Sequence, residues 1–333
     1  MSTFPAKTAP TMRPRIASKV GAEHAPSHLR RRFAEIVDRL RDNPGTSVSP
    51  SKGSPERLWE KVKPILRAAQ IFVGRRVWRY FSSSSKIKEI EGIGRMILSP
   101  WEYIDSRLYF FGTWEPDISR FMVEHITRGS TCIDIGANVG YYTLLMSGAT
   151  GDAGRVYSIE PSPPALKRLR ENIGLNRLKN VRVIPFGVSD QAGRKKFIID
   201  ADNLGASRFE NDSEDGLELK RLCDVISRED LADVSVIKVD VEGMEASILR
   251  EILVLLPQMS ARATVIAEIS SSNETREVVT ALVSRGFRPF LLSNRYSLVD
   301  YATPKRVFPK PVDELPPGKS DIAFVRSSLS AME

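Results

Sequence analysis

The stretch TCIDIGANVGYYTLLMS, residues 131–147, decides the fold that this sequence predicts. It opens with a short apolar run, residues 132–135, which carries Asp134 near its end and is typical of a buried parallel strand. A tight glycine turn over residues 136–140 follows, and a helix is predicted to begin at Tyr141. A strand, a glycine turn and a helix N-terminus in this order are typical of the nucleotide-binding start of a doubly wound α/β sheet, where ligands bind at the carboxyl ends of the strands.

The glycine spacing distinguishes between kinds of nucleotide. A dinucleotide fingerprint, G-x-G-x-x-G, lets the backbone approach a pyrophosphate, but here Asn138 replaces the second glycine and Tyr141 the third. The pattern D-x-G-x-N-x-G therefore suits a ligand without a pyrophosphate, and Asp134 with the loop amides would face a cationic amino-acid end such as that of S-adenosylmethionine. Glu160 closes the next predicted strand, residues 155–159, where a carboxylate can bind both ribose hydroxyls. The alternative is that Asp134 and Glu160 only cap helices.

The composition limits the classes of protein to consider. A chain of 333 residues has room for one large domain and an extension. It has no apolar run of the length of a membrane helix, no secretory signal pattern and only two cysteines, which together predict a cytosolic (cytoplasmic) location. Its three histidines, His24, His28 and His125, argue against a histidine-based triad or a histidine-rich zinc site, so any base is expected to be a carboxylate, a lysine or a tyrosine.

The basic charge is concentrated in the N-terminal third. Residues 1–100 contain 20 Lys and Arg against 8 Asp and Glu, whereas the remainder contains 29 against 33. Residues 1–55 are rich in Pro, Ser, Ala and Arg and are predicted to be a disordered tail. Residues 56–93 are predicted to be a basic amphipathic helical extension and linker, whose surface suits peripheral contact with anionic lipid or an acidic glycan. The favoured interpretation is instead an extension packed on the core or on a second subunit of a homo-oligomer. No nucleic acid is expected, because no recognised nucleic-acid-binding module is present.

Residues 94–328 are predicted to form one α/β domain with a doubly wound, mostly parallel, Rossmann-like sheet of seven strands. Strands are expected at 132–135, 155–159, 180–186, 234–239, 264–269, 287–292 and 321–325. Two further short strands are expected at 94–98 and 106–111, and an antiparallel pair outside the core at 195–200 and 217–222. A polar loop, residues 201–216, joins this pair, and loops of such length inside a compact domain are usually functional or mobile.

Two carboxylates, Asp240 and Glu242, follow the central strand 234–239 and would lie across the ligand crevice from the glycine loop. Glu268 on the neighbouring strand could join them, and converging acids bind either a divalent cation or substrate hydroxyls. The alternative is that Glu242 caps the next helix and that Glu268 pairs with Lys238 inside the sheet. Lys238 faces the same side as Asp240, two residues along the strand, and is expected to be half-buried and to balance charge.

Four segments, FGTWEP (111–116), DIGANVGYYT (134–143), SIEPSP (158–163) and IKVDVEGMEASIL (237–249), resemble the FkbM-type S-adenosylmethionine-dependent methyltransferases. The resemblance covers residues 94–326 and implies a class I methyltransferase fold and O-methylation of hydroxyl groups on sugars, polyketides and related secondary metabolites. Residues 114–116 would close over the cofactor, residues 187–188 would contact its adenine, and Asp240 and Glu242 would line the acceptor side. The predicted residues for binding S-adenosylmethionine are Glu115, Asp134, Gly136, Ala137, Asn138, Gly140, Tyr141, Glu160, Pro161, Gly187, Val188 and Asp240.

The expected reaction is an in-line displacement at a sulfonium, in which the protein mainly positions the reactants. A neutral alcohol is a poor nucleophile and needs a base as it reacts, so Asp240 or Glu242 is the predicted catalytic base, directly or through a water or a metal. A divalent metal is compatible with this pattern, although no motif indicates one. The competing interpretations are N- or C-methylation, a catalytically inactive binding or scaffold module with the same fold, and, least favoured because of the glycine spacing, a dehydrogenase.

Overall fold

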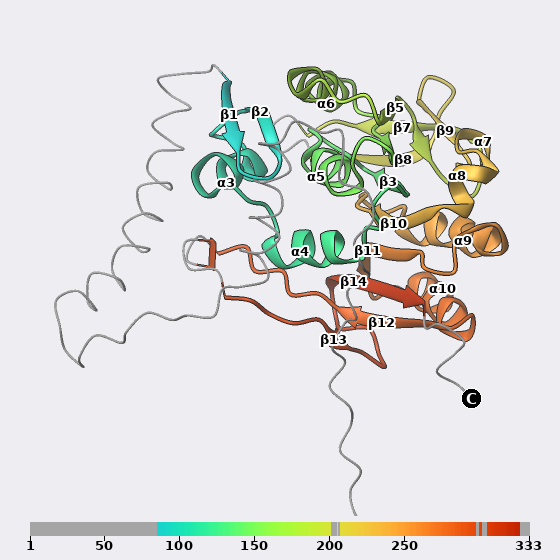
Figure 1. Cartoon of the computed structure of the whole chain (residues 1–333). Helices are drawn as coiled ribbons and strands as arrows, with labels where there is room; N and C mark the ends of the chain where they lie inside the picture. Colours follow the sequence, from blue (N-terminus) through green and yellow to red (C-terminus); the bar gives the residue numbers. More distant parts are fainter. Residues whose placement is uncertain (1–84, 201–204, 206, 298–299, 302–304, 327–333) are drawn as a thin grey trace, which may run out of the picture. The chain divides into compact units, whose positions relative to one another are not determined.

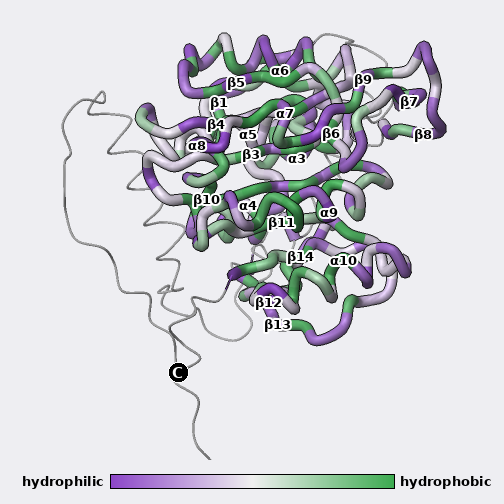
Figure 2. Tube along the Cα trace, turned by 90° about the vertical axis from the view of Figure 1, so that its right-hand side faces the viewer, coloured by the Kyte–Doolittle hydropathy of each residue, from purple (hydrophilic) through white to green (hydrophobic). Residues whose placement is uncertain are grey.

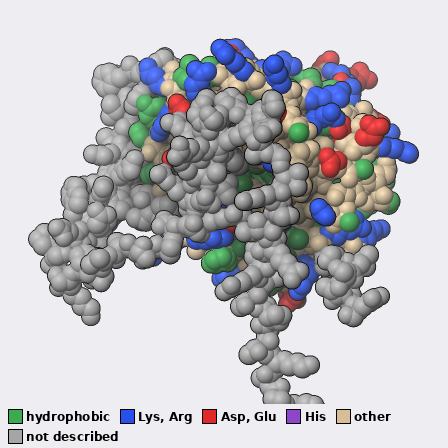
Figure 3. Space-filling view, viewed as in Figure 1, with side chains coloured by type: hydrophobic (Ala, Val, Ile, Leu, Met, Phe, Trp, Pro, Cys, Tyr) green, Lys and Arg blue, Asp and Glu red, His purple; other side chains and the backbone are tan. Residues whose placement is uncertain are grey.

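The computed structural model describes residues 85–200, 205, 207–297, 300–301 and 305–326 (Figure 1). The predictions for residues 1–84, a disordered tail and most of a basic helical extension, lie outside this part of the chain. Within it, no helix is both long enough and apolar enough to cross a membrane. On the face that Figure 3 shows, Lys and Arg side chains are interspersed with Asp and Glu over the described surface.

A mixed sheet of eight strands forms the centre of the described domain, in the order β13-β12-β14-β11-β10-β3-β4-β5. Five neighbouring strands are parallel: β11 (Thr264–Ser270), β10 (Val234–Val239), β3 (Thr131–Ile135), β4 (Arg155–Ile159) and β5 (Val181–Ile184). β14 (Lys319–Arg326) runs antiparallel between β11 and β12 (Phe287–Leu291), and β13 (Lys310–Pro311) is a two-residue strand at the edge. The doubly wound, mostly parallel sheet is confirmed with its seven predicted strands, to which β13 adds an eighth.

Helices cover both faces of this sheet (Figure 1). On one face, α9 (Glu245–Leu255) and α10 (Asn273–Ser284) bury their apolar stripes against the strands. On the other, α4 (Pro116–His125) and α5 (Tyr141–Thr150) do the same, while α6 (Pro163–Asn176) packs Leu166 and Leu169 near the glycine loop. β3 and β10 are buried along their whole length, because neighbours cover them on every side. In Figure 2 the central strands are mostly coloured hydrophobic, while hydrophilic colour is frequent on outer segments such as α6.

The segment before β3 differs from the prediction. Residues 106–111, predicted as a strand, belong to helix α3 (Tyr103–Phe111). A short run of aromatic and aliphatic residues does not show whether it forms a helix or a strand. Here the residues at the two ends of the segment favour the helix. Asp105 in the first turn accepts a hydrogen bond from the amide of Ser99 (2.6 Å), and Gly112 ends the helix in the left-handed conformation.

The strand predicted at residues 94–98 is confirmed as β2 (Gly94–Leu98), which pairs antiparallel with β1 (Lys86–Ile90). β1 lies within the segment that the sequence predicts as extension and linker. Residues 86–90 therefore belong to the folded part of the chain.

A smaller sheet of four strands, in the order β6-β9-β7-β8, follows β5 in the chain. β7 (Gly193–Ile198) and β9 (Leu217–Lys220) form the predicted antiparallel pair, and β6 (Gly187–Val188) lies beside β9. β8 (Arg208–Asp212) lies in the segment predicted as a polar loop; it is a strand because it pairs with β7. Arg208 also forms an isolated backbone bridge with Glu242, which ties this insert to the loop after β10. Two short helices, α7 (Leu222–Val225) and α8 (Arg228–Ala232), lead to β10.

Candidate active site

The loop between β3 and α5 comes very close to the segment after β10. Gly136 has φ +85°, and a Cβ built there would lie 1.8 Å from the carbonyl oxygen of Asp240. Asn138 also has a positive φ, 49°, which Asn tolerates better than most residues. The amides of Gly136 and Ala137 both donate to the carbonyl oxygen of Ile159 (3.0 Å each). The glycine loop is thus fixed between β4 and β10 at the carboxyl ends of these strands.

Glu160 directly follows β4 and holds the same loop through its carboxylate. Its Oε2 accepts a hydrogen bond from the amide of Asn138 (2.7 Å), and its Oε1 accepts one from the amide of Ser162 (2.7 Å). Burial raises the pKa of Glu160 to about 7, although these two amides act in the opposite direction. Because Ser162 is the N-cap of α6, the helix-capping interpretation is partly correct. Each carboxylate oxygen keeps a further lone pair that a ligand hydroxyl can use.

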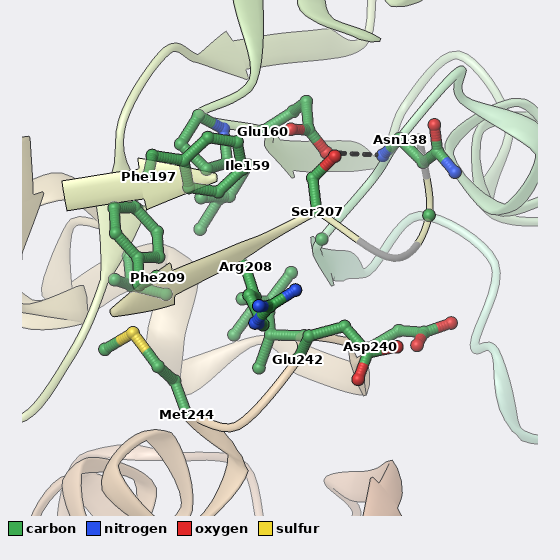
Figure 4. A pocket seen from close by; sticks show the side chains of 17 residues that line it. Asn138, Ile159, Glu160, Phe197, Ser207, Arg208, Phe209, Asp240, Glu242 and Met244 are labelled. Carbon is green, nitrogen blue, oxygen red and sulfur yellow. Dashed lines mark hydrogen bonds between the residues drawn. The ribbon is translucent and has the colours of Figure 1, made fainter. Parts of the chain in front are cut away.

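A pocket opens beside Glu160, with the insert along one side (Figure 4). Glu160 and Asn138 lie at one edge of the pocket in this view, and Asp240 and Glu242 lie at the opposite edge. The structure therefore brings together the acid after β4, the glycine loop and the acids after β10. The predicted residues that line the pocket are Gly136, Asn138, Glu160, Pro161, Gly187, Val188, Asp240 and Glu242.

The insert supplies a wall of the pocket that sequence reasoning missed. Phe197 of β7 and Phe209 of β8 meet edge to face, with ring centroids 4.8 Å apart, and both line the pocket. Ser207 and Arg208, at the start of β8, complete this wall. The sequence signal for it was the length of the polar segment 201–216, which indicated a functional loop without indicating which side chains it contributes.

Three of the predicted cofactor residues stabilise the glycine loop without lining the pocket. Ala137 packs with Leu169 of α6, and a Cβ added at Gly140 would lie 2.7 Å from Cδ1 of the same leucine. The hydroxyl of Tyr141 lies 3.1 Å from Oγ of Ser119, on α4. These residues therefore fix the start of α5 against its neighbouring helices.

Asp134 lies fully buried near the end of β3. Its Oδ2 accepts a hydrogen bond from the hydroxyl of Thr143 (2.6 Å), whereas its Oδ1 has no hydrogen-bond partner among the described residues. Burial raises the pKa of this carboxyl to about 6. Oδ1 of Asn138 is likewise buried without a partner in the described part of the chain. Buried polar atoms without partners are rare in folded proteins. Asn138 lines the pocket, whereas Asp134 does not.

The two predicted catalytic acids are each paired with a lysine. Lys238 is fully buried, not half-buried as predicted, and its Nζ lies 3.0 Å from Oδ2 of Asp240. Burial alone would lower the pKa of Lys238, but the carboxylates around it raise the pKa above its ordinary value. Glu242 accepts a hydrogen bond from Nζ of Lys319, which also donates to Glu268 (3.3 Å). Glu268 therefore pairs with Lys319 of β14, which sequence reasoning missed, and not with Lys238.

Glu115 belongs to a second group of polar side chains and is not among the residues that line the pocket. It precedes α4 with φ 43°, and only 5% of it is exposed. Its carboxylate accepts hydrogen bonds from Tyr142, from Nδ2 of Asn294 (2.9 Å) and from the hydroxyl of Tyr296 (2.8 Å). The same Nδ2 donates to Asp321 (2.7 Å). Among the described residues, no group of three or more His, Cys, Asp and Glu side chains is arranged to hold a metal ion.

Comparisons with known proteins agree with the sequence resemblance. Residues 134–289 match the family model of the methyltransferase FkbM domain. Hexuronic acid methyltransferase AglP of Haloferax volcanii is 26% identical over 173 residues, which are 50% of this chain and 67% of that protein. A protein-L-isoaspartate O-methyltransferase of Methanothrix thermoacetophila is 31% identical over 71 residues, 20% of this chain and 34% of that protein.

A solved structure, methyltransferase FkbM from Methylobacillus flagellatus KT, is 17% identical with a TM-score of 0.38, and the match covers 60% of this chain and 44% of that one. The glycine loop, Glu160 and Asp240 all lie within the residues that match the family. Residues 134–289 of the chain therefore resemble a methyltransferase FkbM domain.

Proposed function

We propose that this chain transfers a methyl group from S-adenosylmethionine to a hydroxyl group of a sugar or glycan. The observation that carries the proposal is the pocket of Figure 4, where Glu160 and the glycine loop face Asp240 beside the two phenylalanines of the insert. This arrangement offers hydrogen-bond acceptors, an apolar wall and negative charge within one site.

The residues of the pocket fit the separate parts of S-adenosylmethionine. Glu160 would accept hydrogen bonds from the ribose hydroxyls, and Phe197 and Phe209 would contact the adenine. The unpartnered oxygens of Asp134 and Asn138 would face the amino-acid end, whose ammonium suits a buried carboxylate. When bound, the cofactor supplies a methyl group on a sulfonium, which an acceptor oxygen can displace.

The acids after β10 would orient the acceptor. Lys238 holds Asp240 and Lys319 holds Glu242, so each carboxylate is fixed while its other lone pairs can accept hydrogen bonds from sugar hydroxyls. Such positioning can contribute much of the rate of a bimolecular transfer. The likeness to a protein named hexuronic acid methyltransferase supports a sugar as the acceptor class.

Isothermal titration calorimetry of the purified chain with S-adenosylmethionine tests the donor. We expect binding by the wild-type chain and by Glu171→Gln, a control on α6 that changes a surface acid whose ion pair within the described part of the chain is with Lys167. Glu160→Gln should bind more weakly. Absence of binding by the wild-type chain would contradict the proposal and favour a scaffold module.

A panel of hexuronic acids, neutral hexoses and their methyl glycosides tests the acceptor. After incubation with S-adenosylmethionine, mass spectrometry should find one added methyl group on at least one sugar, and NMR should locate it on oxygen. A chain that binds the donor but methylates no sugar would contradict the proposed acceptor class.

A further inference from the structure

Two buried carboxylates lie together outside the lining of the pocket. Glu115 precedes α4 and Asp321 belongs to β14, and they are 5% and 4% exposed. The side-chain amide of Asn294 connects them, 2.9 Å from Oε1 of Glu115 and 2.7 Å from Oδ2 of Asp321. Two neighbouring carboxylates in a buried environment resist being charged at the same time, so this pair has a tendency to hold a proton.

Tyr296 connects this pair with the surface. Its hydroxyl donates to Oε1 of Glu115 (2.8 Å), and 37% of the residue is exposed. The other tyrosine that binds this carboxylate, Tyr142, is only 7% exposed. The ring of Tyr296 packs beside that of Trp114, with centroids 5.5 Å apart, which limits its orientations. Tyr296 is therefore the member of the group that a bound acceptor can contact.

The group adjoins the acids proposed to orient the acceptor. Asp321 lies opposite Glu268 in the register of β14 with β11. Nζ of Lys238, the ion-pair partner of Asp240, lies 5.4 Å from the ring centroid of Tyr142, whose hydroxyl donates to Glu115. Glu115 and Tyr296 are thus placed next to the acceptor side of the proposed site.

The acids first predicted as the base are poorly suited to that role. One oxygen of Asp240 and one of Glu242 each face a lysine ammonium, which leaves fewer acceptor sites for the proton of a sugar hydroxyl. Burial instead raises the pKa of Glu115, and burial together with the charge of Glu115 raises the pKa of Asp321 to about 8. A base is most effective when its pKa lies near the working pH.

We propose that Tyr296 contacts the acceptor hydroxyl and passes its proton to Glu115 during the methyl transfer, an inference that rests on the function proposed above. The acceptor oxygen forms a bond to the methyl carbon while the bond from carbon to sulfur breaks. The acceptor proton moves to the oxygen of Tyr296, and the phenolic proton moves to Glu115. The products are a methyl ether, S-adenosylhomocysteine and protonated Glu115, which returns its proton to solvent through Tyr296.

The groups that face Glu115 determine how the transfer should depend on pH. They are Tyr142 of α5, Lys238 and Asp240 at the end of β10, Asp321 of β14, and Asn294 and Tyr296 from the chain after β12, whereas the hydroxyl of Tyr301 meets the backbone amide of Glu115. Burial of Glu115 has the largest effect and raises its pKa, whereas Lys238 lowers it. The turnover number should therefore rise with pH as Glu115 loses its proton.

Two variants and a matched control test this path. Glu115→Gln removes the proton acceptor, and Tyr296→Phe removes the hydroxyl while keeping the ring beside Trp114. The control is Tyr301→Phe, because the hydroxyl of Tyr301 accepts a hydrogen bond from the amide of Glu115 (3.1 Å) and leaves the carboxylate untouched. The measurements are kcat against pH for the sugar that the wild-type chain methylates, the dissociation constant of S-adenosylmethionine, and thermal melting.

We expect Glu115→Gln to lower kcat by about 10²–10⁴-fold and to lose the rise of kcat with pH, as expected when a general base is removed. Tyr296→Phe should lower kcat by about 10-fold or more, and Tyr301→Phe should stay within about threefold of the wild type. Binding of S-adenosylmethionine should change little in all three variants. If Glu115→Gln does not fold, the measurements on Tyr296→Phe test the inference, because Tyr296 is an exposed residue.

Retention of the wild-type kcat and pH profile by Tyr296→Phe and by any folded Glu115→Gln would overturn the inference and leave the proposed function intact. A wild-type chain that methylates no sugar would overturn both.

Discussion

The backbone at Gly136 lets the glycine loop reach the segment after β10. Its φ is +85°, and an added Cβ would lie 1.8 Å from the carbonyl oxygen of Asp240. Gly129 has nearly the same φ, +84°, but nothing lies within 4 Å of a Cβ added there. A comparison of substitutions at these two glycines therefore separates the strain of a left-handed backbone from the effect of a steric clash.

We expect Gly136→Ala to lower the free energy of unfolding by about 3 kcal/mol or more and to abolish binding of S-adenosylmethionine, because the clash adds to the strain of the left-handed conformation. Gly129→Ala should lower it by only about 1–2 kcal/mol and keep binding. Urea unfolding followed by circular dichroism, together with calorimetric titration, measures both effects. Equal destabilisation by the two substitutions would contradict the close approach at Gly136.

Glu160 should make cofactor binding depend on pH. Burial raises its pKa to about 7, so below that pH the carboxyl becomes protonated and accepts hydrogen bonds from ribose hydroxyls less well. Glu160→Gln should weaken binding of S-adenosylmethionine by about 10- to 100-fold, the value of a hydrogen bond to a charged group, and should remove the pH dependence near pH 7. Calorimetric titration from pH 6 to pH 8 measures both; an unchanged affinity would remove Glu160 from the ribose site.

At the scale of elements, the insert of β6 to β9 forms one wall of the pocket. Phe197 and Phe209 belong to different strands, so their contact depends on the pairing of β7 with β8. Phe209 also packs against the main core as a partly buried residue. Removing its ring should therefore affect both the cofactor site and the docking of the insert.

We expect Phe209→Ala to raise the dissociation constant of S-adenosylmethionine by about 10-fold and to destabilise the chain by about 1–3 kcal/mol, less than for a fully buried Phe. Phe308→Ala is the matched control, because Phe308 is 65% exposed and does not line the pocket. The control should bind the cofactor as the wild type does. Equal affinities in the two variants would show that the insert does not contact the ligand.

The parallel strands could be predicted from the sequence, whereas α3 and β8 could not. Short aliphatic runs alternating with amphipathic helices specify β3, β4 and β10 locally. The segment of α3 has no clear period, and the ends that favour the helix act through Ser99 and Gly112. β8 contains several polar residues and depends on pairing with β7, a contact that no local pattern encodes.

The same division holds for the candidate site. Asn138, Glu160 and Asp240 follow parallel strands, and the carboxyl ends of such strands meet at one edge of a sheet, so their convergence could be predicted. Lys319 and Tyr296 could not, because they reach the site from β14 and from the chain after β12. Lys319 lies 51 residues from Glu268 in the sequence, and Tyr296 lies 181 residues from Glu115. Only the folded chain brings the members of each pair together.

At the scale of the whole molecule, buried acids should make stability fall as the pH rises through neutrality. Burial raises the pKa of Asp134 to about 6, of Glu160 to about 7 and of Asp321 to about 8. In the unfolded chain these carboxyls are ionised above about pH 5. Between its unfolded pKa and its folded pKa, each of these carboxyls is protonated in the folded state and ionised in the unfolded state. The free energy of unfolding therefore decreases as the pH rises through this interval.

Between about pH 6.5 and about pH 8.5 we expect the free energy of unfolding to fall by about 3 kcal/mol, of which Asp321 contributes about 2 kcal/mol. Asp190 and Asp230, whose pKa values are lowered, titrate below this range and do not contribute to the change. Burial lowers the pKa of His125, so the change in stability that accompanies its titration lies mostly below about pH 6.5. Urea unfolding at several pH values, with Asp321→Asn as the comparison, measures this slope, which should be smaller in the variant; stability that rises with pH would contradict the prediction.

Loss of these protons should in turn strengthen the binding of a cationic ligand. As Asp134 and Glu160 become charged, the site gains negative charge that a sulfonium can balance. The dissociation constant of S-adenosylmethionine should therefore fall by about 3- to 10-fold from pH 6.5 to pH 8.5. S-adenosylhomocysteine is the matched ligand, because it keeps the ribose, adenine and amino-acid groups but lacks the sulfonium charge, so its affinity should change less. Thermal shifts at about 100 times each dissociation constant, where a ligand stabilises by about 2.7 kcal/mol, give an independent check. An equal pH dependence for both ligands would mean that the buried acids do not respond to the charge of the methyl donor.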